Sequence, residues 1–304
     1  ERGLVLSMLG KHDDALQCIQ RALELERQDG MIWYSYAEEL MLLGRYQEAL
    51  GALDEALQRE SRHPEIWSKY GQAARALGLY EQALNAYDHA VQLDPDFSWA
   101  WNGRGLTLRE LGHNQDALAS FRRAAEIDPN VVWYYINQVS LLLDSDEQQA
   151  ALSVAETALQ QVPNNKSAWA RHAQVLRRMG RYRDAIHSYD RALDIAPRYA
   201  WAWNGKGLCY AALENWPEAV NSYQQAVRYD ANDVWFLHNY GEALMSAGRL
   251  QAAIDAFEQA LALAPDHEPT LDKLRRLRNG SDDDADTNAG ADDTGTHDNS
   301  DNEG

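Results

Sequence analysis

The sequence has few of the residue patterns on which disulfides, metal sites and catalytic centres depend. Two cysteines, Cys18 and Cys209, lie far apart among its 304 residues, so we expect small buried apolar side chains rather than a disulfide. The nine histidines are scattered, and the sequence contains no His-x3-His pair, no CxxC pair and no glycine-rich phosphate loop. We therefore expect no metal, no cofactor and no catalysis from this chain.

Long apolar runs are also missing. No stretch of about 18 consecutive apolar residues occurs, so the sequence predicts no membrane span. The formal net charge of −19 argues against bulk nucleic-acid binding, although nine acidic residues fall in the last 25 positions. Because unpaired cysteines suit a reducing compartment, we expect a cytoplasmic location. Because the sequence starts with Glu1 inside an expected helix, we also expect further chain before it.

A repeat of 34 residues dominates what is present. Alanine recurs at this spacing in two series, offset by seven residues, without insertion or deletion. Such a period is typical of helix-turn-helix units, because one unit cannot bury its apolar face alone and stacks on its neighbours. Seven residues make two helical turns, so each alanine pair marks one face of a second helix. The two series are Ala15, Ala49, Ala83, Ala117, Ala151, Ala185, Ala219 and Ala253, and Ala22, Ala56, Ala90, Ala124, Ala158, Ala192, Ala226 and Ala260.

Other positions of the repeat carry recurring residue types. A small residue such as Gly71 precedes the first alanine by 12 positions, and a large one such as Trp67 precedes the small one by four. A glycine such as Gly78 commonly ends the first helix, where a left-handed cap suits a residue without Cβ. A proline such as Pro95 closes most units, because it stops the second helix.

These residues resemble the tetratricopeptide repeat family. The family pattern begins with W-x2-[L/Y]-G-x2-[A/Y], which the segment from Trp67 onward matches. Five later positions of the pattern are matched by Tyr80, Ala83, Tyr87, Ala90 and Pro95. The resemblance runs from Glu1 to about Asn279. It implies an all-α fold, a right-handed superhelical solenoid whose inner groove is lined by the first helix of each repeat. Such grooves typically bind peptides or partner proteins, and the resemblance implies no chemistry.

The uninterrupted period predicts one elongated array over residues 1–279. Leu271, Leu274 and Leu277 share one side of an expected capping helix that seals the last repeat. Residues 280–304 contain no leucine, isoleucine, valine or aromatic residue, so we expect a disordered acidic tail. The expected units are a truncated first repeat 1–29, the full repeats 30–63, 64–97, 98–131, 132–165, 166–199, 200–233 and 234–267, and the capping helix 268–279.

The repeat 132–165 departs from the pattern. Val139 takes the place of the small residue, Asp146 replaces the capping glycine, and Ala155 stands where other repeats have an aromatic ring. A bulky residue at a close-approach site and a small one at a filling site predict a local change of superhelical pitch, as a hinge or a kink that faces a partner. The alternative is sequence drift that the aromatic run 133–135 compensates.

Four extra tryptophans, two positions before the usual large residue, form a second departure. The resemblance places this position on the inner groove, where an indole suits partner binding. Asparagines about one helical turn later offer a donor and an acceptor to an extended peptide, as asparagine ladders do in some members of the family. The alternatives are indoles that pack sideways on the preceding repeat and asparagines that face solvent or act as caps. The residues are Trp99, Trp133, Trp201 and Trp235, with Asn102, Asn137, Asn204 and Asn239.

A third departure is electrostatic. The repeat 166–199 contains eight basic and three acidic residues, a net charge of +5 inside an acidic protein. The resemblance places Arg177 and Arg178 on the groove, and Arg109 at an equivalent position two repeats earlier. Paired guanidinium groups bind carboxylates or phosphates, so with two flanking extra tryptophans they predict a pocket for an acidic ligand. The alternative is a solvated face whose arginine stems cover apolar surface.

Two hypotheses for the function follow. The first is a non-catalytic scaffold or adaptor that binds an extended peptide or a partner domain in its groove, with acidic ligands as one option. The second is a recruitment domain of a larger enzyme, of the glycosyltransferase or kinase type, whose catalytic part lies outside this chain. Both predict a protein or peptide partner rather than nucleic acid or membrane.

Overall fold

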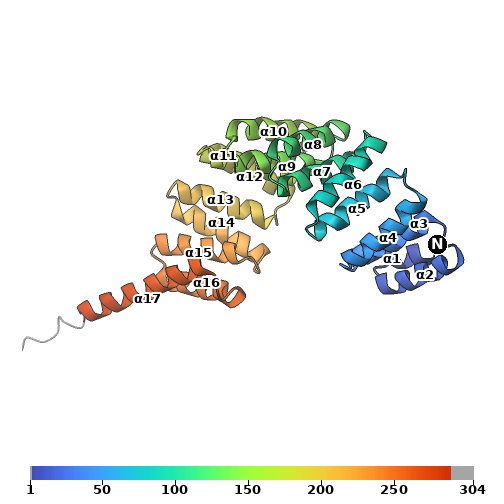
Figure 1. The fold of residues 1–304 in the computed structure, drawn as a ribbon. Helices are drawn as coiled ribbons and strands as arrows, with labels where there is room; N and C mark the ends of the chain where they lie inside the picture. The colour runs from blue at the N-terminus through green and yellow to red at the C-terminus, as the bar shows by residue number, and fades with distance from the viewer. Residues whose placement is uncertain (1, 289–304) are drawn as a thin grey trace, which may run out of the picture. The chain divides into compact units, whose positions relative to one another are not determined.

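The computed structural model describes residues 2–288, and within them the chain forms seventeen α-helices and no strand. Within residues 2–161, and again within residues 182–288, each helix packs on the next one along the chain (Figure 1). The residues group into two compact bodies, an N-terminal body, Glu1–Val175, and a C-terminal body, Leu176–Gly304. Each body is described by itself below.

The N-terminal body consists of helices that pair in sequence order. Figure 1 shows the pairs α3 with α4, α5 with α6 and α7 with α8 side by side. The helices are α1 (Arg2–Met8), α2 (His12–Leu25), α3 (Gly30–Leu42), α4 (Tyr46–Arg59), α5 (Pro64–Ala76), α6 (Tyr80–Leu93), α7 (Ser98–Glu110), α8 (Asn114–Ile127), α9 (Val132–Asp144), α10 (Gln148–Gln161) and the larger part of α11 (Lys166–Arg178).

The C-terminal body continues the same pairing and ends in a longer helix than expected. α17 continues through 280–288, part of the expected disordered tail, as an extension of the helix that 268–279 already form. The rest of that tail, 289–304, lies outside the described residues. After the end of α11 the helices are α12 (Tyr182–Ile195), α13 (Ala200–Ala212), α14 (Trp216–Tyr229), α15 (Val234–Ser246), α16 (Leu250–Leu263) and α17 (Glu268–Asn288).

The alanine series forms the inner face of the second helices. Ala49, Ala83 and Ala117 in the N-terminal body and Ala185 and Ala219 in the C-terminal body are fully buried. Leu274 of α17 is buried as well, in an apolar cluster that includes residues of α15 and α16. Leu277 packs against this cluster. The all-α solenoid of helix-turn-helix repeats that the period predicts is therefore confirmed.

The usual large residue of each repeat also ties the linker to the first helix. Where that residue is tryptophan, its indole Nε1 donates to a backbone carbonyl six residues earlier. Trp67 donates to Ser61 at 2.8 Å and Trp203 donates to Pro197 at 2.9 Å, and Trp33, Trp101 and Trp169 make the same bond. These five rings thus have a structural role.

The irregular repeat 132–165 keeps the fold of its neighbours. In regular repeats the small residue faces a ring: a Cβ added to Gly71 would lie 2.8 Å from the ring of Tyr87. In this repeat the larger Val139 takes the position of the glycine, and the smaller Ala155 takes the position of the ring. Both are buried, at 0% and 1% exposure. The exchange of a large and a small residue leaves both positions packed inside the body, and the predicted change of superhelical pitch stays a prediction.

The turn between paired helices needs a left-handed residue. Gly78 and Gly112 adopt φ angles of 74° and 78° there, and Asp146 and Glu214 adopt 58° and 56° at the same turn. Asp146 therefore replaces the glycine without changing the turn. A left-handed conformation costs a residue with Cβ about 1–2 kcal/mol.

We expect Glu214→Gly to raise the free energy of unfolding of the C-terminal body by about 1 kcal/mol, because glycine adopts this conformation without a clash of Cβ. Urea denaturation followed by circular dichroism measures the change. Gly112→Ala is the matched control in the opposite direction, and should destabilise the N-terminal body by about 1 kcal/mol. Equal stability of Glu214→Gly and wild type would show that the left-handed turn carries no strain.

Candidate functional site

A surface formed by α7 and α9 of the N-terminal body carries two of the extra tryptophans. Trp99 is 65% exposed and Trp133 is 60% exposed, a large apolar area for side chains without an internal role. Beside them Nδ2 of Asn137 donates to Oδ1 of Asn102 at 2.8 Å and links the two helices. Asn102 is buried and Asn137 is half-buried, so Asn137 is the amide of this pair that a ligand can reach.

α13 and α15 of the C-terminal body repeat this arrangement. Nδ2 of Asn239 donates to Oδ1 of Asn204 at 3.0 Å, and Trp235 is 55% exposed. Trp201 differs, because it is half-buried and its ring centroid lies 6.2 Å from the rings of Tyr189 and Tyr199. Sideways packing on the preceding repeat, the alternative reading of these indoles, describes Trp201.

The helices α7 and α13, one from each surface, begin with nearly the same sequence at a distance of three repeats. The segments WAWNGRGL, from Trp99, and WAWNGKGL, from Trp201, differ at one position. Each contains a glycine against which a tyrosine of the preceding repeat packs: an added Cβ would lie 2.3 Å from Tyr87 at Gly103, and 2.3 Å from Tyr189 at Gly205. Reasoning from the 34-residue period missed this duplication, although an alignment of the sequence with itself contains it.

The arginines expected on the groove have different surroundings. Arg109 forms a 3.3 Å ion pair with Glu110 of its own helix. Arg178 is exposed, whereas Arg177 is half-buried. Burial raises the pKa of the Cys209 thiol to about 12, and the positive charge of Arg177 opposes this effect. The buried Nε of Arg177 has no hydrogen-bond partner within residues 2–288. The two guanidinium groups thus differ in exposure.

The predicted pocket that combines both arginines with Trp133 and Trp201 draws on both bodies. Trp133 belongs to the N-terminal body, and Arg177, Arg178 and Trp201 belong to the C-terminal body. That combination stays a prediction.

A histidine pair lies next to Trp235, and the sequence reasoning missed it. Nδ1 of His238 and Nδ1 of His267 lie 2.9 Å and 2.6 Å from the hydroxyl oxygen of Thr270, on α17. The Trp235 ring meets both imidazoles edge to face, at 5.6 Å and 4.6 Å between centroids. Burial lowers the pKa of His238, which is 4% exposed. The spacing of 29 residues between the histidines gives no local sequence signal.

Within the described part of the chain, no group of three or more His, Cys, Asp or Glu side chains is arranged to hold a metal ion. Among the same residues, no helix combines the length and the apolar composition that crossing a bilayer requires.

Family models match most of the chain. All four are described as tetratricopeptide or TPR repeats, and they match residues 166–232, 71–112, 1–64 together with 210–268, and 98–131. No curated protein sequence matches the chain.

Several solved structures have a similar fold. Yeast Tom70 aligns with a TM-score of 0.67 and 17% identity over 91% of this chain and 60% of Tom70. A tetratricopeptide repeat protein from Parabacteroides merdae aligns with a TM-score of 0.63 and 15% identity over 82% of this chain and 98% of its own. The APC/C hetero-tetramer Cut9–Hcn1 contains a chain that aligns with a TM-score of 0.61 and 16% identity over 88% of this chain, which spans 52% of that chain.

Proposed function

Because the chain belongs to the tetratricopeptide repeat family, we propose that it is a protein-interaction scaffold that binds extended peptide segments on the first helices of its repeats. The observation that carries this proposal is that each body has exposed indoles next to a hydrogen-bonded asparagine pair. Examples are Trp99 with Asn102 in the N-terminal body and Trp235 with Asn239 in the C-terminal body. An exposed tryptophan costs solubility, and its aromatic face is a frequent centre of binding energy.

The chemistry of the duplicated surface suits a peptide main chain. The half-buried amides of Asn137, Asn204 and Asn239 suit the N–H and C=O groups of an extended backbone. The indoles beside it supply apolar area for the peptide's side chains. Two copies of the surface, one on each body, favour a partner that carries two similar segments.

We expect the double variant Trp99→Ala/Trp133→Ala to lose about 30-fold in affinity for peptides selected against the wild-type chain, since aromatic anchors that become buried on binding contribute about 2 kcal/mol or more. Peptides from a phage-displayed library, measured by isothermal titration calorimetry, provide the test. Leu93→Ala is the matched control, because Leu93 is an exposed apolar residue at the end of a second helix. A peptide set whose affinities are the same for the wild type and for the double variant would contradict the assignment of the surface.

An acidic ligand remains part of the proposal. The exposed guanidinium of Arg178 favours a carboxylate or phosphate on the partner. Arg178→Ala should then weaken binding of acidic peptides more than binding of neutral ones.

The proposed scaffold is non-catalytic and cytoplasmic. The second candidate, a recruitment domain of a larger enzyme, uses the same surfaces.

A further inference from the structure

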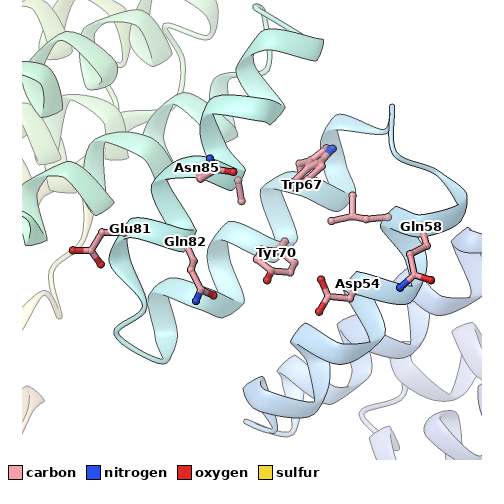
Figure 2. Close-up of a pocket in the computed structure, with 9 residues that line it drawn as sticks. Asp54, Gln58, Trp67, Tyr70, Glu81, Gln82 and Asn85 are labelled. Atoms are coloured by element: carbon pink, nitrogen blue, oxygen red, sulfur yellow. The ribbon is translucent and has the colours of Figure 1, made fainter.

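A separate pocket lies between the second helices of neighbouring repeats. Residues of α4, α5 and α6 line an open cavity of about 750 Å³ in the N-terminal body, the α4–α6 pocket. Figure 2 shows Asp54 and Gln58 extending from α4, Trp67 and Tyr70 from α5, and Gln82 from α6. The cavity has the volume of a small-molecule site, and it is lined by carboxylate, amide and aromatic groups.

The same place in another repeat of this body is filled by a cation of the chain itself. Asp88 corresponds to Asp54, 34 residues later, and Nε of Arg104 donates to its Oδ1 at 2.6 Å. The guanidinium carbon of Arg104 lies 5.7 Å from the ring centroid of Trp101, which corresponds to Trp67. Carboxylate, guanidinium and indole thus form a stack in which the cation is held by charge on one side and by the ring on the other.

The C-terminal body contains this stack as well. Nζ of Lys206 lies 2.6 Å from Oδ1 of Asp190 and 5.3 Å from the ring centroid of Trp203. Asp190 and Trp203 again occupy the places of Asp54 and Trp67 in their repeats. A carboxylate and an indole in these two places therefore hold a basic side chain in two independent settings.

The α4–α6 pocket has the carboxylate and the indole without the cation. Tyr70 stands where the other two repeats have Arg104 and Lys206, and within residues 2–288 Asp54 has no ion pair. Burial raises the pKa of the Asp54 carboxyl, and the charge of Asp54 in turn adds to the effect of burial in raising the pKa of Tyr70. The carboxylate is thus partly desolvated and close to the tyrosine, with cavity beside it.

We propose that the α4–α6 pocket binds the guanidinium group of an arginine from a partner protein, between the carboxylate of Asp54 and the aromatic side chains of Trp67 and Tyr70. His89 already stacks on Trp67 with centroids 4.5 Å apart, so the arginine takes the side of the indole that faces the cavity. A guanidinium fits better than an ammonium, because it is planar, pairs with a carboxylate through two bonds and stacks on rings. The site does not depend on the proposed peptide-binding surfaces.

The test titrates the full chain with acetyl-arginine methylamide and follows the indole N–H resonance of Trp67 by NMR. We expect a saturable shift with this probe, a smaller one with the lysine analogue, and none with the citrulline analogue, which has the same shape without the charge. Asp54→Asn should weaken binding of the arginine probe about fivefold, the size expected for one partly exposed charge-assisted pair.

Two further variants use the chain's own stacks. Tyr70→Arg places a cation where Arg104 lies in the next repeat, so it should occupy the pocket and abolish the response to the probe. Asp88→Asn removes a carboxylate that Arg104 already pairs with, so the response of Trp67 should remain unchanged. Thermal melts of each variant establish that it is folded.

Three results would overturn the proposal. The first is a flat titration of wild type, the second an equal response to the citrulline analogue, and the third an unchanged affinity in Asp54→Asn. Trp99→Ala/Trp133→Ala leaves the α4–α6 pocket intact, so that variant should bind the arginine probe normally even where the peptide-binding proposal fails.

Discussion

Replacing Gly205 with alanine is expected to destabilise the C-terminal body by about 2 kcal/mol. A Cβ at this position would lie 2.3 Å from Cζ and 2.4 Å from the hydroxyl oxygen of Tyr189, and that ring is 1% exposed. Overpacking of a buried site costs about 1–3 kcal/mol, and the better helix propensity of alanine offsets up to about 1 kcal/mol of it. Urea denaturation of the full chain, followed by circular dichroism, measures the loss.

Gly51→Ala is the matched control for this experiment. Gly51 lies inside α4, and a Cβ added there meets no atom within 4 Å, so alanine should stabilise the helix by up to about 1 kcal/mol. Gly103→Ala should behave like Gly205→Ala, because Tyr87 approaches it as closely. If Gly205→Ala and Gly51→Ala shifted stability equally, the close approach of Tyr189 would carry no energetic weight, and the first helices would not need glycine beside the asparagine pairs.

The fold could be predicted from the sequence because each of its rules repeats. Ala83 and Gly78 are uninformative alone, but burial of the first and a left-handed turn at the second follow once the 34-residue spacing is seen. The end of α17 could not be predicted in this way. The polar composition of 280–288 predicts disorder, yet a preceding helix that is docked through Leu274 supplies the nucleus that extension needs.

The candidate site was harder to predict, because its residues depend on what lies beside them. Trp99 and Trp201 stand in nearly identical segments, yet Trp99 is exposed whereas Trp201 packs on Tyr189 and Tyr199. The partner of each asparagine lies 35 residues away, one more than the period, so the pairs look irregular in the sequence and regular in space.

The pairing of the Asp54 carboxylate could not be predicted from the repeat pattern either. Asp54, Asp88 and Asp190 share one place in the repeat, and the period alone treats them as equivalent. Whether each carboxylate is paired depends on the side chain that the next repeat contributes, Tyr70 in one case and Arg104 in another. The pairing of these carboxylates therefore depends on the combination of neighbouring repeats, which the consensus positions do not contain.

Lowering the pH from 7 to 5 is expected to loosen α17 from the C-terminal body. Burial lowers the pKa of His238, so the unfolded chain binds more protons than the folded body below the ordinary histidine pKa of about 6.5. The stability is therefore complete above that pH and decreases as the pH falls toward the folded pKa, by up to about 1.4 kcal/mol per pH unit. Hydrogen exchange of residues 268–278 measures the opening.

The groups around His238 determine how specific this response is. Glu242 favours the protonated imidazole from 3.8 Å, but Lys273 pairs with Glu242 at 2.6 Å and weakens this effect, and His267 opposes a second positive charge. His238→Asn keeps a polar group beside Thr270 and cannot titrate, so the exchange of α17 should become nearly independent of pH. His113→Asn, on an exposed position of the N-terminal body, should leave the pH response of α17 as it is in wild type. A response that persists in His238→Asn would show that His238 does not control the opening of α17.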